Sequence, residues 1–168
     1  MMVRTARSSN GGFGRWGSET DQYHRDRPGR THAERLIGTL LPTGFECGVL
    51  NGKVAPGSTV AIVGAGPIGL AALLTAQFYS PAEVIMIDLD DNRLEVARRF
   101  GATQTINSGD GKATEKVNAL TAGQGVDAAI EAVGVPATFL LCQDLVAPGG
   151  VLANVGVHGT KASKGLDD

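Results

Sequence analysis

Short hydrophobic runs alternate along the chain with longer stretches in which apolar residues recur at helical spacing. The runs are rich in Val, Ile and Ala, as is typical of buried strands, and cover Thr59–Val63, Val84–Ile87, Thr103–Asn107, Val126–Val133 and Val151–Val155. The helical stretches are an Ala/Leu-rich segment that starts near Pro67, then Asp90–Phe100, Lys112–Leu120 and Pro136–Val146. Strands separated by helices require right-handed crossovers, and these place helices on both faces of a parallel sheet. We therefore predict an α/β fold with a doubly wound parallel sheet in the strand order 3-2-1-4-5.

The two ends of the chain do not follow this pattern. Residues 1–35 are rich in Arg, Gly and Ser and lack apolar periodicity, which predicts a disordered or irregular N-terminal arm. Residues 36–159 form the predicted domain, and residues 160–168 form a polar tail. Ahead of the first strand, apolar spacings of three and four predict a helix over about Thr43–Asn51, with Pro42 in its first turn and Leu41 extended before it.

A glycine-rich turn, GAGPIG at residues 64–69, joins the first strand to the next helix. Gly64 allows a tight turn, Gly66 has no Cβ to keep a pyrophosphate from the backbone, and Gly69 lets the helix lie against the sheet. Pro67 and Ile68 open the helix, whose unpaired N–H groups and positive dipole end attract an anion. Such a turn also occurs as plain structure. The order strand, turn, helix nevertheless predicts a dinucleotide-binding Rossmann fold, with these five residues at the pyrophosphate.

An acidic residue, Asp88, ends the second hydrophobic run 19 residues after Gly69. An acid at this distance can accept hydrogen bonds from the adenosine ribose hydroxyls of NAD. Its carboxylate would repel the additional phosphate of NADP, so we predict NAD as the cofactor. The alternative is an acid that caps the following helix or turn, because Asp90 and Asp91 follow closely.

Composition and charge narrow the classes of protein to consider. The formal net charge is −2, which gives no overall attraction to nucleic acid or to a membrane surface. The two cysteines, Cys47 and Cys142, have no CxxC spacing, so they predict neither a disulfide framework nor a zinc knuckle. We expect a cytoplasmic protein without a membrane partner. The arginines of residues 1–33 also suggest two other interpretations, a nucleic-acid-binding arm or a transit peptide. The acids among them and the lack of an amphipathic pattern disfavour both.

Beyond the glycine turn, most of the predicted domain resembles the zinc-type medium-chain alcohol dehydrogenases. The resembling segments are TGFECGVLNGKVAPGSTVAIVGAGPIGLAALLTAQ, VIMIDLDDNRLEVARRFGAT, GQGVDAAIEAVG and LVAPGGVLANVGVHG. The resemblance implies a NAD-binding Rossmann domain, with Thr43 near the nicotinamide and Arg93 near the adenine. It also implies two loops that line the cofactor and hold its carboxamide through backbone groups, formed by Val133 and Gly134 and by Val155, Gly156 and Val157.

The segments that bind zinc in this family have no counterpart in residues 1–35. The family uses a cysteine, a Gly-His-Glu segment and often a four-cysteine loop to hold zinc, and residues 1–35 contain none of these. Thr39 stands where the family places a Cys or Asp ligand, and the three histidines are not spaced as a ligand set. We expect His158 to be a surface histidine and both cysteines to be buried small residues.

We therefore predict the cofactor-binding half of a NAD-dependent alcohol dehydrogenase, inactive alone and without catalytic or metal-binding residues of its own. Two alternatives stay open: a non-catalytic NAD-binding regulatory module, and a scaffold with a vestigial nucleotide site. The match ends before a sixth strand, so an exposed sheet edge could also favour a homo-oligomer.

Overall fold

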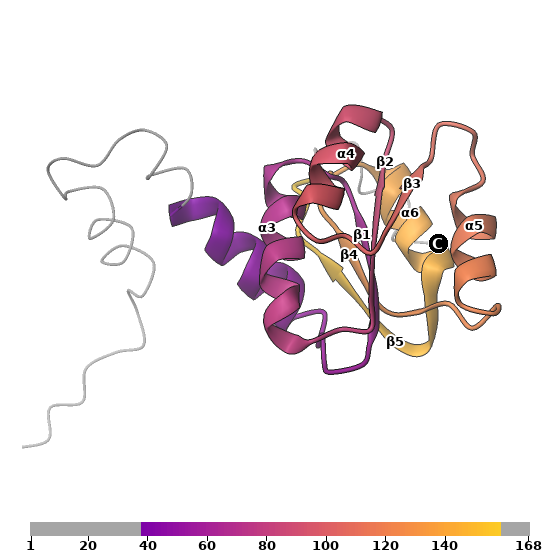
Figure 1. Ribbon diagram of the computed structural model, residues 1–168, viewed down its shortest axis with the longest axis horizontal. Helices are drawn as coiled ribbons and strands as arrows, with labels where there is room; N and C mark the ends of the chain where they lie inside the picture. Colours follow the sequence, from indigo (N-terminus) through magenta and orange to yellow (C-terminus); the bar gives the residue numbers. More distant parts are fainter. Residues whose placement is uncertain (1–37, 159–168) are drawn as a thin grey trace, which may run out of the picture. The chain divides into compact units, whose positions relative to one another are not determined.

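A five-stranded parallel sheet with helices on both faces makes up the described part of the chain (Figure 1). The computed structural model describes residues 38–158, so the predicted arm at 1–35 and the predicted tail at 160–168 lie outside the described residues. The strands are β1 (Thr59–Val63), β2 (Glu83–Asp88), β3 (Gln104–Asn107), β4 (Val126–Glu131) and β5 (Val146–Asn154). The helices are η1 (Thr43–Leu50), α3 (Pro67–Ala76), η2 (Gln77–Tyr79), α4 (Asp91–Arg99), α5 (Ala113–Leu120) and α6 (Pro136–Leu145). The order β3-β2-β1-β4-β5 confirms the predicted doubly wound fold.

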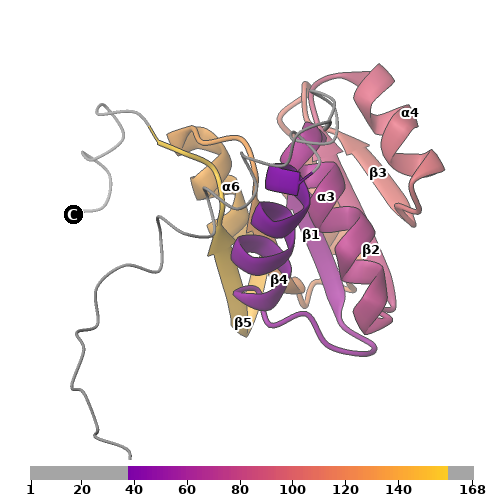
Figure 2. The same cartoon turned by 90° about the vertical axis from the view of Figure 1, so that its left-hand side faces the viewer.

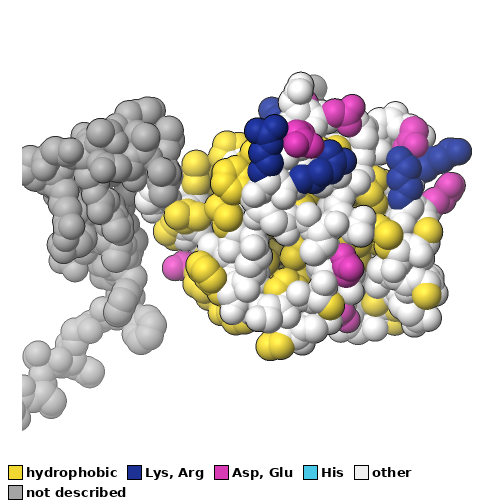
Figure 3. Space-filling view, viewed as in Figure 1, with side chains coloured by type: hydrophobic (Ala, Val, Ile, Leu, Met, Phe, Trp, Pro, Cys, Tyr) yellow, Lys and Arg dark blue, Asp and Glu magenta, His cyan; other side chains and the backbone are white. Residues whose placement is uncertain are grey.

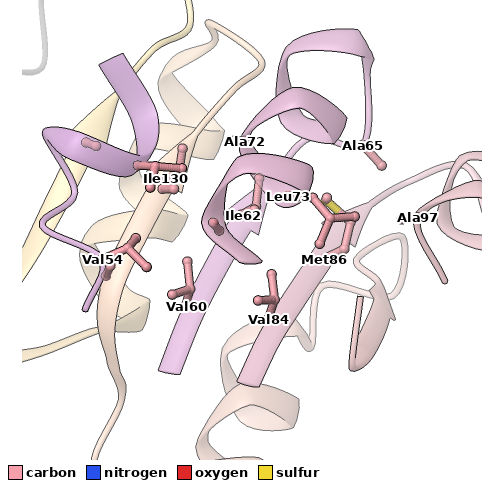
Figure 4. Close-up of a cluster of buried hydrophobic side chains, with 14 of the residues drawn as sticks. Val54, Val60, Ile62, Ala65, Ala72, Leu73, Val84, Met86, Ala97 and Ile130 are labelled. Carbon is pink, nitrogen blue, oxygen red and sulfur yellow. The ribbon is translucent and has the colours of Figure 1, made fainter. Parts of the chain in front are cut away.

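Each face of the sheet carries its own buried apolar cluster, because successive strand side chains point to opposite faces. On one face, strand residues pack against η1, α3 and α4; they are Val60, Ile62, Val84, Met86, Ala128 and Ile130. Figure 4 shows several of these side chains directed toward α3, and Figure 2 shows η1 and α3 side by side over this face. The strand residues that pack against α5 and α6 on the other face are Ala61, Val63, Ile85, Ile87, Ile106 and Ala129.

The helix before β1 starts earlier than its sequence predicts. Residues 38–42 are already helical and continue into η1, which has the wider π winding, so Leu41 is helical rather than extended. Pro42 itself has φ −59° and ψ −40°, within the helical region. The reason is close packing on α3: a Cβ on Gly44 would lie 2.7 Å from the backbone nitrogen of Ala72. This contact between helices overrides the local preference of a residue that precedes proline.

Two strand boundaries in the C-terminal half of the chain also differ from prediction. β4 ends at Glu131 rather than Val133, because Gly134 adopts φ +89° and turns the chain away from the sheet. β5 begins at Val146 rather than Val151. Its register with β4 shifts between Val126 and Ala128, so the Pro-Gly-Gly segment at residues 148–150 is an irregularity within the strand rather than a turn before it.

The outer face of α4 carries several charged residues. Figure 3 shows basic and acidic side chains intermingled over this helix. Arg98 and Arg99 form ion pairs with Glu95, at 3.1 and 3.4 Å, and hydrogen bonds from both arginines lower the pKa of the Glu95 carboxyl. This surface is therefore a solvated, charge-paired face. Within residues 38–158, no helix combines the length and apolar character that crossing a membrane requires.

Candidate functional site

The segments that leave the carboxyl ends of β1, β2, β4 and β5 lie along one edge of the sheet. The strand order reverses between β1 and β4, since the chain moves from β1 to β2 on one side and later returns to β4 on the other. Parallel α/β sheets bind ligands at such a reversal, outside the carboxyl ends of the strands. This edge is therefore where a ligand site is expected.

The glycine turn after β1 has the geometry its sequence predicts. Gly64 has φ +106°, a conformation that favours glycine, and its N–H donates to the carbonyl of Ile87 over 2.8 Å. Gly69 contacts this turn so closely that a Cβ on it would collide with the Gly64 carbonyl oxygen. These two glycines let α3 start directly against the end of β1.

Gly66 differs from its two neighbours in the motif, because nothing within the described chain requires it to be glycine. Its φ of −75° and ψ of −177° are open to any residue, and a Cβ there would meet no atom within 4 Å. Within residues 38–158 no side chain caps the N-terminus of α3, which begins at Pro67, and no partner bonds to the N–H of Ile68. The backbone of Gly66, Pro67 and Ile68 therefore forms an open cradle at the positive end of α3, which suits a phosphate group.

Asp88 lies next to this cradle, at the end of β2. Its Oδ2 accepts a hydrogen bond from the N–H of Ala65 over 2.6 Å, and its Oδ1 accepts one from Asp90 over 3.0 Å. The cap of α4 is Asp90, whose side chain accepts from Asn92, so Asp88 is not the helix cap; its bond from Asp90, two residues on, does make it an acid of the turn before α4. Arg93 extends from the first turn of α4, with Nη1 3.9 Å from Asp88 Oδ2, and is mostly exposed.

The loops after β4 and β5 pack on one another. A Cβ on Gly134 would lie 2.6 Å from the carbonyl oxygen of Val157, and a Cβ on Gly156 would collide with the backbone nitrogen of Gly134. The side chain of Val133 lies close to the glycine turn, since a Cβ on Gly64 would be 2.7 Å from one of its methyl groups. The side chain of Val157 is almost fully exposed, and within the described residues no group bonds to its N–H. The structure thus brings these two predicted loops together with the glycine turn.

Thr43 approaches the same edge from η1. Its Oγ1 donates to the carbonyl of Thr39 over 2.7 Å. Further along, Gly48 packs near Val155 and Gly52 packs near Ala153, so η1 runs antiparallel to β5. The start of η1 therefore points toward the carboxyl ends of the strands.

Sequence reasoning missed one residue at this edge, Glu131, which it treated as part of a strand. The side chain of Glu131 is fully buried, and its carboxylate accepts hydrogen bonds from Val133, Gly134 and Thr138. The available signal was an acid among small apolar residues at the end of a buried parallel strand, shortly before a glycine.

Comparison with known proteins agrees with this architecture. Residues 67–167 match the family described as zinc-binding dehydrogenase. The chain is 41% identical over 119 residues to an alcohol dehydrogenase of Cupriavidus necator, across 71% of this chain and 32% of that protein. The chain belongs to the zinc-binding dehydrogenase family. This membership confirms the resemblance to zinc-type alcohol dehydrogenases.

Two further relatives show how far the likeness extends. The NADP-dependent isopropanol dehydrogenase of Thermoanaerobacter brockii is 35% identical over 124 residues, which are 74% of this chain and 35% of that protein. The solved structure of zinc dependent alcohol dehydrogenase 2 from Streptococcus pneumonia is 65% identical with a TM-score of 0.71, covering 72% of this chain and 35% of that chain. The chain thus spans about a third of the length of these relatives.

The zinc of these dehydrogenases has no fitting ligand set in the described part of the chain. Across residues 38–158, no three His, Cys, Asp or Glu side chains come together as a metal site. Burial, with the adjacent Glu131 carboxylate, raises the pKa of Cys142 to about 12, so its thiol stays neutral. Cys142 is a buried small residue as predicted, but Cys47 is exposed, contrary to prediction. His158 is partly buried and lies 2.9 Å from Asn154 Oδ1.

Proposed function

We propose that this chain binds NAD along the carboxyl edge of its sheet, as the cofactor-binding domain of an alcohol dehydrogenase. The observation that carries this proposal is Gly66. Neither backbone conformation nor packing explains its missing side chain, whereas a pyrophosphate resting on the backbone would explain it. The uncapped N-terminus of α3 supplies the N–H groups and the dipole that such an anion requires.

The adenosine half of the cofactor would lie against the end of β2. Asp88 would accept hydrogen bonds from the ribose hydroxyls, and Arg93 would lie over the adenine. The described contacts to Asp88 use two acceptor positions of its carboxylate, which leaves further lone pairs available. Two relatives are named as NADP-dependent, but a carboxylate at this position favours the unphosphorylated ribose, so we propose NAD for this chain.

The nicotinamide half would lie over the loops after β4 and β5. Backbone groups of Val133–Gly134 and of Val155, Gly156 and Val157 would hold the carboxamide, and Thr43 would flank the ring from η1. The N–H of Val157, which has no partner within the described residues, is a suitable donor for this purpose. Bound NAD would supply the hydride acceptor, while the chain would orient the ring and shield one side of it.

The described residues contain no metal-ligating cluster that could polarise the alcohol oxygen. Within residues 38–158 no side-chain cluster fits zinc, and residues 1–37 contain neither a cysteine nor a Gly-His-Glu segment. We therefore propose that the chain binds NAD without oxidising alcohols unaided.

The direct test is calorimetric titration of the 168-residue chain with NADH, in parallel with the variant Gly66→Val. The wild-type chain should bind, and Gly66→Val should lose binding because the valine side chain occupies the cradle. Stability should change by no more than about 1 kcal/mol, because the backbone conformation accepts valine and no neighbour is displaced.

Thermal unfolding of both proteins is the control, and Gly66→Ala tests whether the loss follows side-chain size. NADH binding that survives Gly66→Val would refute the assignment of the glycine turn. If NADH binds and a specific protein partner responds to it, the regulatory alternative would be favoured over the enzyme.

A further inference from the structure

Glu131 combines full burial with contacts to both loops at the proposed nicotinamide end. It is the one fully buried charged side chain among the described residues. A carboxylate is costly to remove from water, and the cost is offset only where hydrogen bonds satisfy its oxygens. The partners of this carboxylate therefore indicate what it holds in place.

The carboxylate binds the loop after β4 and the first turn of α6. Oε1 accepts hydrogen bonds from the N–H groups of Val133 (3.0 Å) and Gly134 (2.9 Å) and from the hydroxyl of Thr138 (2.6 Å). Oε2 also lies 3.2 Å from the N–H of Gly134 and 3.7 Å from Nε2 of His158. The direction in which this loop leaves the sheet is thus set by a side chain rather than by strand pairing.

The backbone of the same residue binds the other loop. The carbonyl oxygen of Glu131 accepts hydrogen bonds from Val155 (2.8 Å) and Gly156 (3.1 Å). A Cβ on Gly156 would collide with Oε2, so this loop passes directly across the carboxylate. Gly134, which the carboxylate holds, in turn lies against Val157 and its unpartnered N–H.

We propose that Glu131 is a positioning residue that fixes the spacing of the two loops so that their free backbone groups face the nicotinamide carboxamide. This rests on the proposed function, because it assumes that NAD lies on these loops. Glu131 would position only the nicotinamide end of the cofactor. Asp88 and the N-terminus of α3 would hold the other end, and the hydrogen bonds of the Asp88 carboxylate do not involve Glu131.

The variant Glu131→Gln isolates this role because it keeps the size of the side chain. An amide has one acceptor oxygen, and its NH₂ group would face the N–H of Gly134, so one of the two loops must shift. Thr138→Val is a second, milder variant, which removes one donor to the carboxylate. Thr75→Val is the matched control, since the Thr75 hydroxyl is also buried but bonds only to carbonyls of its own helix, α3.

The experiment compares the affinities of the full chain and each variant for NADH and for ADP-ribose, which has the adenosine and pyrophosphate but no nicotinamide. Glu131→Gln should weaken NADH binding about tenfold or more, since the bonds to Oε1 are no longer charge-assisted and the new NH₂ group opposes the N–H of Gly134, and leave ADP-ribose binding within about twofold. Thr138→Val should show the same selectivity to a smaller extent, and Thr75→Val should not change the ratio.

Equal losses for both ligands in Glu131→Gln, or no loss, would overturn the positioning role while leaving NAD binding intact. Should Glu131→Gln not fold, Thr138→Val decides by the same ratio, and an unchanged ratio there overturns the inference. A wild-type chain that binds neither ligand would instead refute the proposed function, and this inference with it.

Discussion

Asp88 joins two structural elements through the two oxygens of its carboxylate. One oxygen accepts from Ala65 in the glycine turn, and the other accepts from Asp90 before α4. The bond to Ala65 holds the turn at a fixed distance from β2. In the proposed complex this would fix the pyrophosphate cradle relative to the ribose, so Asp88 would act on both affinity and specificity.

Replacing Asp88 by Ser should therefore reduce the preference for NADH over NADPH. Serine removes the charge that repels the additional phosphate and replaces charge-assisted bonds to the ribose, each worth about 1.5–3 kcal/mol, so we expect the ratio of the two dissociation constants to shift about tenfold or more. Calorimetric titration with both dinucleotides measures this ratio.

Asp90→Ser is the matched control for the Asp88 variant. It removes an acid two residues away, and serine can still cap α4. Its NADH to NADPH ratio should stay close to that of the wild type. An unchanged ratio in Asp88→Ser would remove Asp88 from the ribose site.

The two acids at this edge differ in how far the sequence reveals them. Asp88 follows a strand at the spacing that dinucleotide folds require, so its place could be predicted. Glu131 could not be predicted in the same way, because its bonds to Gly134 and Thr138 depend on how the loop after β4 folds, and Gly156 is distant in sequence. A residue whose partners are brought together only by the fold leaves a weak local signal.

At the scale of elements, η1 and α3 differ in whether the local sequence predicts where the helix starts. The start of α3 follows from its glycines and proline, which are local signals. The start of the helix that contains η1 does not, since Pro42 and the residue before it locally favour a boundary that packing on α3 overrides. The early end of β4 combines a local cause, the positive φ of Gly134, with the bonds that the Glu131 carboxylate makes to the following loop.

Gly44 tests whether this packing holds η1 in place. Gly44→Ala would put a methyl group within 3 Å of Ala71 and Ala72, and such overpacking typically costs 1–3 kcal/mol. We expect a lower free energy of unfolding in urea. Gly48→Ala, in the same helix, is the control, because its Cβ would meet Ile130 at 3.3 Å and needs only a small adjustment. Equal stabilities of the two variants would show that α3 does not restrain η1 at Gly44.

At the scale of the whole molecule, the strand order could be predicted because right-handed crossovers leave few topologies for alternating strands and helices. That order places the glycine turn, Asp88 and both loops on one edge, which no single segment specifies. It also separates the two apolar clusters, each of which attaches helices to one face. The edge at the carboxyl ends of the strands therefore lies between two packed layers. Substitutions of partly exposed residues at this edge, such as Gly66, need not disturb the apolar cluster on either face.

This arrangement predicts binding without turnover for the isolated chain. In the proposed complex the sheet edge holds the dinucleotide, but hydride transfer also needs an alcohol whose oxygen is held and polarised, and the described residues contain no metal-ligating cluster for that task. With NAD, zinc and ethanol or isopropanol, we expect no NADH absorbance above the protein-free background, while NADH still binds to the same preparation. Gly66→Val distinguishes a contaminant from the chain itself, because it should remove only activity that depends on this cradle. Zinc-dependent oxidation that disappears in Gly66→Val would contradict the prediction and would place substrate-polarising groups in residues 1–37 or 159–168.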